Sequence, residues 1–150
     1  RTDIILFKLR GEFAPKRIGV SLGGSGNLNL IVRLAGALAD RYGGHITFMN
    51  ILPEDYTADQ KAHSSKILVE AIRHHGAKAL YRIEVASSDK PLDFLVERSA
   101  EFDLLVVGAT KVRFLEKAVV GPFSSQIATR SDCSVAVVRV APAVKKIMPI

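Results

Sequence analysis

Two turns in this sequence have the residue types that bind anions. The segment at residues 23–27 reads GGSGN and follows a short apolar run, and a longer segment runs from Gly108 to Ser125. The far end of the second segment, residues 121–125 (GPFSS), is typical of a helix start, where free backbone N–H groups attract phosphate and other anions. These two turns are therefore the candidate ligand site of the chain.

Patterns of catalysis or metal binding are not evident elsewhere in the sequence. The glycine-rich turn lacks the Lys-Ser/Thr ending of a P-loop, and Ser124 and Ser125 have no nucleophile-elbow pattern. His74 and His75 are adjacent on an expected helix, so their side chains diverge and do not easily chelate one ion. Cys133, the single cysteine, precedes an apolar strand and is expected to be a packing residue. We therefore expect a non-catalytic protein without a metal site.

Short apolar strands alternate with helices along the chain. The strands are expected at residues 17–22, 45–52, 78–85, 103–108 and 134–140, with a helix in each interval. Strands that are apolar on both faces and alternate with helices form a parallel sheet that is covered on both sides. The predicted fold is therefore α/β: an open, Rossmann-like, five-stranded parallel sheet in the order 3-2-1-4-5. In that order the first and fourth strands are neighbours, and the two turns border one crevice at their carboxyl ends.

The spacing of the second turn resembles that of the universal stress protein family, whose prototype gives the domain its UspA-like name. After its fourth strand, that family has a glycine, two residues, a glycine, nine residues, a glycine and a small hydroxyl residue. Gly108 and Gly121 stand at the two outer glycines. The segments RIGVSLGGS, DLLVVGAT and SDCSVAVVRV are also similar to that family's first strand and turn, fourth strand and fifth strand. The resemblance covers about residues 16–140, and it implies ATP or another adenine nucleotide as the ligand.

Three positions depart from the family pattern. Lys111 replaces the middle glycine, Pro122 replaces the hydroxyl residue, and Gly23 replaces an aspartate at the end of the first strand. A side chain at 111 hinders close approach to the backbone, Pro122 has no N–H, and Gly23 removes a carboxylate that holds ribose or a metal-bound phosphate. Charges at positions 111 and 113 and a serine hydroxyl are the available substitutes. The nucleotide-binding residues implied by the resemblance are Gly23, Gly24, Gly108, Thr110, Lys111, Arg113, Gly121, Ser124 and Ser125.

The altered pattern looks like the versions of this domain that are appended to amino-acid permeases, chloride channels and cation/proton antiporters. This resemblance implies a regulatory or sensor domain on the cytoplasmic side, tethered to the inner membrane as part of the transporter polypeptide. An initial Arg1 rather than Met agrees with that expectation. The resemblance also implies a homodimer through the last strand, Ser134 to Val140, which is apolar and suited to edge pairing. Two alternatives stay open: a stand-alone universal stress protein with weak ATP binding or hydrolysis, and a ligand-free structural dimerisation domain.

The formal net charge of +6 comes from the two ends of the chain. Residues 1–17 hold five Lys/Arg and two acidic residues, residues 139–150 hold three Lys/Arg and no acid, and residues 18–138 are formally neutral. A protein that binds nucleic acid carries its basic side chains on one face of the folded domain. Because the excess positive charge here lies at the chain ends, no nucleic-acid partner is expected. Basic ends of this kind either lie near anionic lipid or are solvated tails.

Length and composition indicate one domain. A chain of 150 residues that is 48% hydrophobic forms one substantial core, and no apolar run approaches the roughly 20 residues of a membrane span. A single cysteine excludes an intrachain disulfide and fits a cytoplasmic location. We divide the chain into an N-terminal segment or linker (1–15), the domain (16–140) and a basic C-terminal tail (141–150). Within the first segment, the apolar run from Ile4 to Phe7 is either an extra edge strand or part of a linker.

Overall fold

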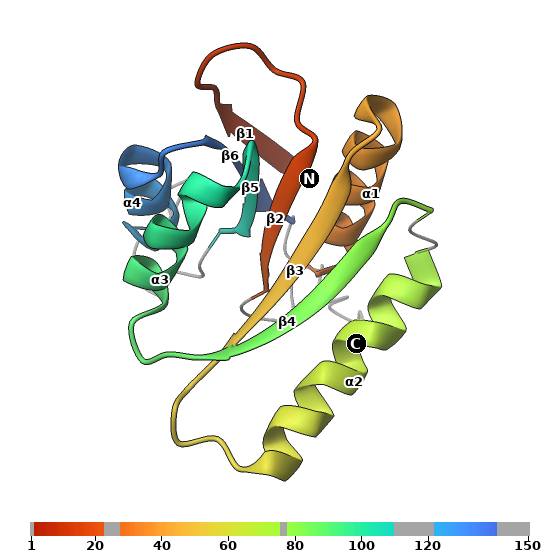
Figure 1. The fold of residues 1–150 in the computed structure, drawn as a ribbon, viewed down its shortest axis with the longest axis vertical. Helices are drawn as coiled ribbons and strands as arrows, with labels where there is room; N and C mark the ends of the chain where they lie inside the picture. Colours follow the sequence, from red (N-terminus) through yellow and green to blue (C-terminus); the bar gives the residue numbers. More distant parts are fainter. Residues whose placement is uncertain (1, 23–27, 76–77, 110–121, 141–150) are drawn as a thin grey trace, which may run out of the picture.

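A six-stranded sheet carries helices on both of its faces in the computed structural model, which describes residues 2–22, 28–75, 78–109 and 122–140 (Figure 1). The elements in chain order are β1 (Ile4–Lys8), β2 (Arg17–Leu22), α1 (Leu28–Tyr42), β3 (His45–Leu52), α2 (Ala58–His75), β4 (Tyr81–Ser87), α3 (Pro91–Arg98), the short 3-10 helix η1 (Ser99–Glu101), β5 (Leu104–Gly108), α4 (Pro122–Arg130) and β6 (Ser134–Arg139).

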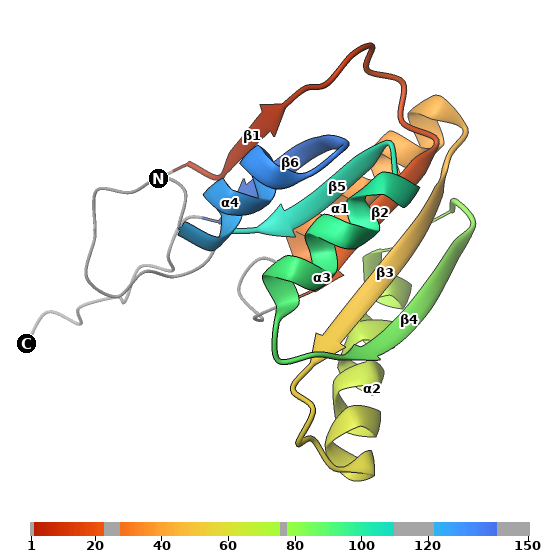
Figure 2. The same ribbon diagram turned by 60° about the vertical axis from the view of Figure 1, so that its left-hand side comes forward.

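The strand order is β1-β6-β5-β2-β3-β4. Strands β2 to β6 pair in parallel, and their order is the predicted 3-2-1-4-5 when they are counted from β2. The predicted strand count is wrong by one, and the sheet is mixed, because β1 pairs antiparallel with β6. The apolar run at Ile4 to Phe7 is thus part of an edge strand (Figure 2).

Strand pairing, a hydrogen bond and aromatic contacts hold β1 and the segment after it against the domain. The register runs from Ile4 opposite Arg139 to Lys8 opposite Val135. Just beyond β1, the backbone N–H of Arg10 donates to the Ser134 hydroxyl at 2.8 Å. Aromatic rings continue the attachment on the α1 side, where Phe13 makes edge-to-face contacts with Phe7 at 5.6 Å and with Tyr42 at 5.7 Å between centroids.

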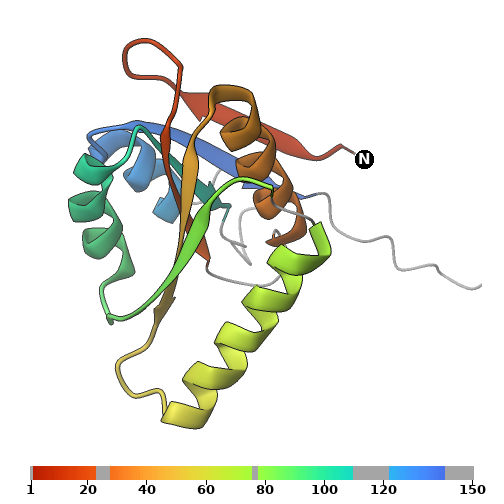
Figure 3. The ribbon, with the colours of Figure 1, turned by 45° about the vertical axis from the view of Figure 1, so that its right-hand side comes forward.

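Two apolar cores lie on opposite faces of the sheet. Figure 3 shows α1 and α2 on one side and α3 and α4 on the other. One core packs α1 and α2 on side chains such as Ile18 and Phe48, and the other packs α3 and α4 on side chains such as Leu105 and Val135. Strand β5 contributes to both cores, since Leu104 to Val107 are at most 1% exposed. A parallel sheet buried on both faces is the arrangement that the apolar strands predicted.

Local signals account for most of the element ends. Gly43 has φ +65°, the left-handed conformation that commonly ends a helix, directly after Tyr42. Before α2, Thr57 and Gln60 form a reciprocal capping box, with hydrogen bonds of 2.8 and 3.2 Å. The strand expected at 78–85 is displaced to Tyr81–Ser87, and the helix expected between the third and fourth predicted strands divides into α3 and η1.

Candidate functional site

The carboxyl ends of β2 and β5 lie side by side. These strands pair in parallel through Ile18 with Leu104 and Val20 with Val106, and they end at Leu22 and Gly108. The two candidate turns therefore start from neighbouring strand ends, as the predicted strand order requires. In an open α/β sheet, this is the edge at which ligands bind.

Ser124 contacts Gly108 at this edge. The Ser124 hydroxyl donates a hydrogen bond of 3.2 Å to the Gly108 carbonyl oxygen, and Ser124 is completely buried. Two of the predicted site residues are thereby brought together, and the start of α4 is fixed to the end of β5. The Ser124 hydroxyl therefore fixes the start of α4 at this edge, and its predicted role in nucleotide binding stays a prediction.

Ser125 lies on a different surface. It is exposed and lines a groove of about 240 Å³ between α4, β1 and β6, together with Leu6, Lys8 and Val137. Its backbone carbonyl oxygen accepts a hydrogen bond of 2.9 Å from the Thr129 hydroxyl. The structure thus separates the two adjacent serines, one against β5 and the other toward β1.

The other predicted site residues lie outside the described part of the chain. They are Gly23, Gly24, Thr110, Lys111, Arg113 and Gly121. Their assignment to the site stays a prediction.

Asn50 is a polar residue at the same edge that the sequence reasoning did not single out. It stands opposite Leu22 in the β2–β3 ladder and is 5% exposed. Its amide nitrogen donates to the Ser64 hydroxyl at 2.9 Å and so ties β3 to α2. The available signal was an amide side chain near the carboxyl end of the predicted strand HITFMNIL.

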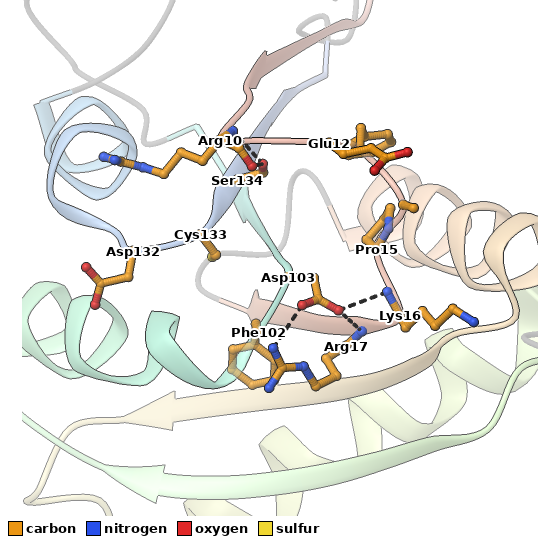
Figure 4. A pocket seen from close by; sticks show the side chains of 12 residues that line it. Arg10, Glu12, Pro15, Lys16, Arg17, Phe102, Asp103, Asp132, Cys133 and Ser134 are labelled. Atoms are coloured by element: carbon orange, nitrogen blue, oxygen red, sulfur yellow. Dashed lines mark hydrogen bonds and ion pairs between the residues drawn. The ribbon is translucent and has the colours of Figure 1, made fainter.

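A larger hollow of about 560 Å³ lies at the opposite, amino ends of the strands (Figure 4). The segment that connects β1 to β2 forms one wall, and the starts of β5 and β6 form the other. The Asp103 and Cys133 side chains face the hollow, whereas Arg10 and Glu12 extend toward its two sides. This hollow is at the opposite end of the strands from the carboxyl edge where the sequence predicts the ligand site.

Hydrogen bonds and an ion pair in this hollow hold the start of β2 against the residue before β5. Asp103 Oδ2 accepts hydrogen bonds from the backbone N–H groups of Lys16 and Arg17 at 3.1 and 2.9 Å, and Oδ1 pairs with the Arg17 guanidinium at 2.9 Å. The hydrogen bond from Arg17 lowers the pKa of Asp103. Burial raises the pKa of the Cys133 thiol to about 11. Cys133 therefore stays a thiol at neutral pH, which suits packing and not nucleophilic chemistry.

Neither a metal centre nor a membrane span occurs in the part of the chain that the structure describes. No three His, Cys, Asp or Glu side chains in residues 2–22, 28–75, 78–109 and 122–140 converge as metal ligands. Within the same ranges, none of the helices combines the length and the apolar composition needed to cross a bilayer.

Comparison with known proteins gives a consistent family. The model of the universal stress protein family matches residues 15–139. The search of curated proteins found no match to the chain. The fold is similar to a universal stress protein crystallised in complex with cAMP, with TM-score 0.68, 22% identity, and coverage of 85% of this chain and 99% of that one.

Two further structures have a similar fold. The universal stress protein from Archaeoglobus fulgidus in complex with dAMP has TM-score 0.61 and 17% identity, and covers 84% of this chain and 99% of that one. A universal stress protein family member from Arabidopsis thaliana with AMP bound has TM-score 0.57 and 14% identity, and covers 85% of this chain and 93% of that one.

Proposed function

Because this chain belongs to the universal stress protein family, we propose that it is a non-catalytic regulatory module that binds an adenine nucleotide. The site is the carboxyl edge of β2 and β5. The observation that carries the proposal is the adjacency of these two strand ends, with Ser124 fixing α4 to Gly108. The complexes of similar folds with cAMP, dAMP and AMP support the ligand class.

The proposed recognition relies on charge in place of glycine. Lys111 and Arg113 hold the phosphates of the nucleotide, as cations near a helix start do in many anion sites. Gly23 supplies no carboxylate for a metal ion at the end of β2. Binding is therefore proposed to be independent of Mg²⁺, and hydrolysis is not part of the function.

Calorimetric titration of the full chain tests this proposal. We expect saturable binding of ATP, AMP or cAMP with similar affinity in the presence and absence of Mg²⁺. Lys111→Ala is expected to weaken it about tenfold, since a charge-assisted hydrogen bond contributes about 1.5–3 kcal/mol. Lys66→Ala, an exposed position on α2, is the matched control. Absence of binding by all three nucleotides contradicts the proposal and favours a structural domain, and Mg²⁺-dependent phosphate release contradicts its non-catalytic part.

We further propose that the module regulates a membrane transporter from the cytoplasmic side. The support is the resemblance of its altered turn pattern to transporter-appended domains. The gene sequence upstream of Arg1 tests this part cheaply. Membrane-spanning segments encoded in the same frame support it, whereas a start codon at that point without such segments contradicts it.

A further inference from the structure

Strand β4 is one of the two outer strands of the sheet. It lies at the end of the strand order opposite β1, and in the described part of the chain it pairs with β3 alone (Figure 1). Its seven residues, Tyr81–Ser87, include neither proline nor glycine. A regular outer strand whose N–H and C=O groups are unpaired on one side is a template for another strand.

The hydrogen bonds to β3 indicate which backbone groups of β4 face outward. At the two ends of the strand, the Leu80 carbonyl oxygen accepts a hydrogen bond from β3 and the Ser88 N–H donates one to β3, each at 2.9 Å. The even-numbered residues between them therefore face β3. Because successive strand residues alternate in direction, the N–H and C=O groups of Tyr81, Ile83 and Val85 face away from the sheet.

The face of β4 that lies toward α2 exposes apolar side chains. Tyr81 and Val85 share this face with Ile83, which packs against the core beneath α1 and α2. Because α2 packs mainly on α1 and β3, Tyr81 and Val85 stay 44% and 47% exposed. The Tyr81 ring makes an edge-to-face contact with Phe48 at 5.9 Å between centroids, which holds it at the outer strand.

The opposite face of β4 carries one basic and one acidic side chain. Arg82 pairs with Glu84 at 3.0 Å, and Glu84 also accepts a hydrogen bond of 2.8 Å from Arg98 of α3. The hydrogen bond from Arg98 lowers the pKa of Glu84, so this carboxylate is charged at neutral pH. The Arg82 side chain is 66% exposed, and it can therefore meet a second carboxylate beyond the edge.

These two patterns make β4 complementary to a second copy of itself. In an antiparallel pair centred on Ile83, Tyr81 stands opposite Val85 of the second copy. Arg82 then stands opposite Glu84 of that copy, at a non-hydrogen-bonded position where side chains lie closer together. The outward backbone groups of the two strands meet and pair. Registers centred on Arg82 or Glu84 instead place like charges opposite each other, which is unfavourable.

The other outer strand lacks this complementarity. β1 has the sequence IILFK, in which Lys8 is the one charged residue. Antiparallel pairing of β1 with a copy of itself, centred on Leu6, places Lys8 opposite Ile4 of the copy. A strand with a single charge cannot compensate that charge by pairing with itself. Charge complementarity therefore distinguishes β4 from β1.

We propose that two copies of the chain associate through their β4 strands, antiparallel and centred on Ile83, so that the two sheets form one continuous sheet. The interface is isologous, because each copy contributes the same residues to it. Tyr81 and Val85 pair across it on the α2 side, and Arg82 and Glu84 pair on the α3 side. The interface does not include the ends of β2 and β5, so it goes beyond nucleotide binding and is tested without nucleotide.

Sedimentation equilibrium of the full chain tests the proposal by exchange of charges. We expect a dimer, and we expect Arg82→Glu to raise its dissociation constant at least about a hundredfold, since both Arg–Glu pairs become Glu–Glu pairs. Glu84→Arg is expected to do the same through Arg–Arg pairs. An equimolar mixture of the two variants is expected to dimerise within about tenfold of the original affinity, because each cross-strand pair again has opposite charges.

Val85→Lys supplies a second variant that leaves the contact between Glu84 and Arg98 in place. It is expected to weaken the dimer at least about tenfold, because it puts a charge in the apolar part of the interface. Matched controls lie on β1, where Lys8→Glu and Leu6→Lys change exposed residues. Their dissociation constants are expected to stay within about twofold of the original value. Circular dichroism is the check that each variant is folded.

Four results overturn the proposal. They are a full chain that stays monomeric up to about 0.1 mM, a dimer that neither Arg82→Glu nor Val85→Lys weakens, a dimer that the β1 controls dissociate, and folded charge variants that do not dimerise when mixed. Because Arg82→Glu removes the β4 interface, it is also the background in which association through the last strand is measured.

Discussion

Asp103 joins the starts of β2 and β5 with a single carboxylate. It accepts two backbone N–H groups and pairs with Arg17. Because the pKa of Asp103 is lowered in the folded state, its carboxylate stabilises the fold at pH values above its unfolded pKa of about 3.9. That contribution is lost as pH falls through the lower folded pKa. We expect Asp103→Asn to lower the urea midpoint at pH 7, and the difference from the original chain to shrink below about pH 4.

The control for this prediction is Asp93→Asn. Asp93 pairs with Arg130 at 3.1 Å, but both side chains are largely exposed, and exposed pairs contribute little to stability. Its urea midpoint is therefore expected to stay close to that of the original chain. A difference for Asp103→Asn that is constant from pH 7 to pH 3 contradicts the proposed role of the charge.

The adjacent serines at the start of α4 have different expected roles. Ser124→Ala removes the hydroxyl that donates to Gly108 from a buried position, so it is expected to lower the free energy of unfolding by about 1 kcal/mol. Ser125→Ala changes an exposed side chain and is expected to alter it by less than about 0.5 kcal/mol. Urea denaturation of both variants measures the difference. Equal effects contradict the assignment of Ser124 as the residue that fixes α4 to β5.

At the scale of elements, two glycines are expected to respond in opposite directions to alanine. A Cβ atom at Gly44 meets the backbone carbonyl oxygen of Lys16 at 2.8 Å, between α1 and β3. Gly44→Ala is therefore expected to destabilise the fold by about 1–3 kcal/mol. A Cβ atom at Gly36, inside α1, meets no atom within 4 Å, and Gly36→Ala is expected to stabilise it by about 0.5–1 kcal/mol. Thermal unfolding of the Gly44→Ala and Gly36→Ala variants tests the close approach of the starts of β2 and β3. Destabilisation by both substitutions contradicts the expected difference between the two positions.

The elements that the sequence predicted well are those with strong local signals. The parallel strands are apolar runs bounded by turns, and Gly43 and the Thr57–Gln60 box mark helix ends in the sequence itself. The pairing of β1 could not be predicted, because the apolar run at Ile4 to Phe7 fits an edge strand or a linker, and only contacts with the distant β6 decide between them. The same reason applies to Ser124, whose partner Gly108 is 16 residues away.

The hollow at the amino ends of the strands is likewise a product of tertiary structure. It exists because the connection from β1 crosses the starts of β5 and β6 on its way to β2. No local pattern in residues 9–16 indicates that path. By contrast, the adjacency of the ends of β2 and β5 follows from the strand order, so sequence reasoning predicted that adjacency but not the hydrogen bond from Ser124 to Gly108.

At the scale of the whole molecule, β1 bears on the predicted homodimer. Both sides of β6 carry ladders, with β5 on one side and β1 on the other. Pairing of two copies through Ser134 to Val140 therefore requires β1 to leave β6. Dimerisation through this strand stays a prediction, and its condition is the release of β1 from β6.

Deletion of residues 1–9 meets that condition. It removes β1 and leaves the β6 ladder and the side chains of Val135 and Val137 open, and an uncovered edge strand is a template for another chain. We expect the shortened chain to dimerise at least tenfold more tightly than the full chain in sedimentation equilibrium, since the full chain must first lose its own β1–β6 pairing. Circular dichroism is the check that the shortened chain is folded. Equal dimerisation of the full and shortened chains contradicts a role for β1 in covering this edge.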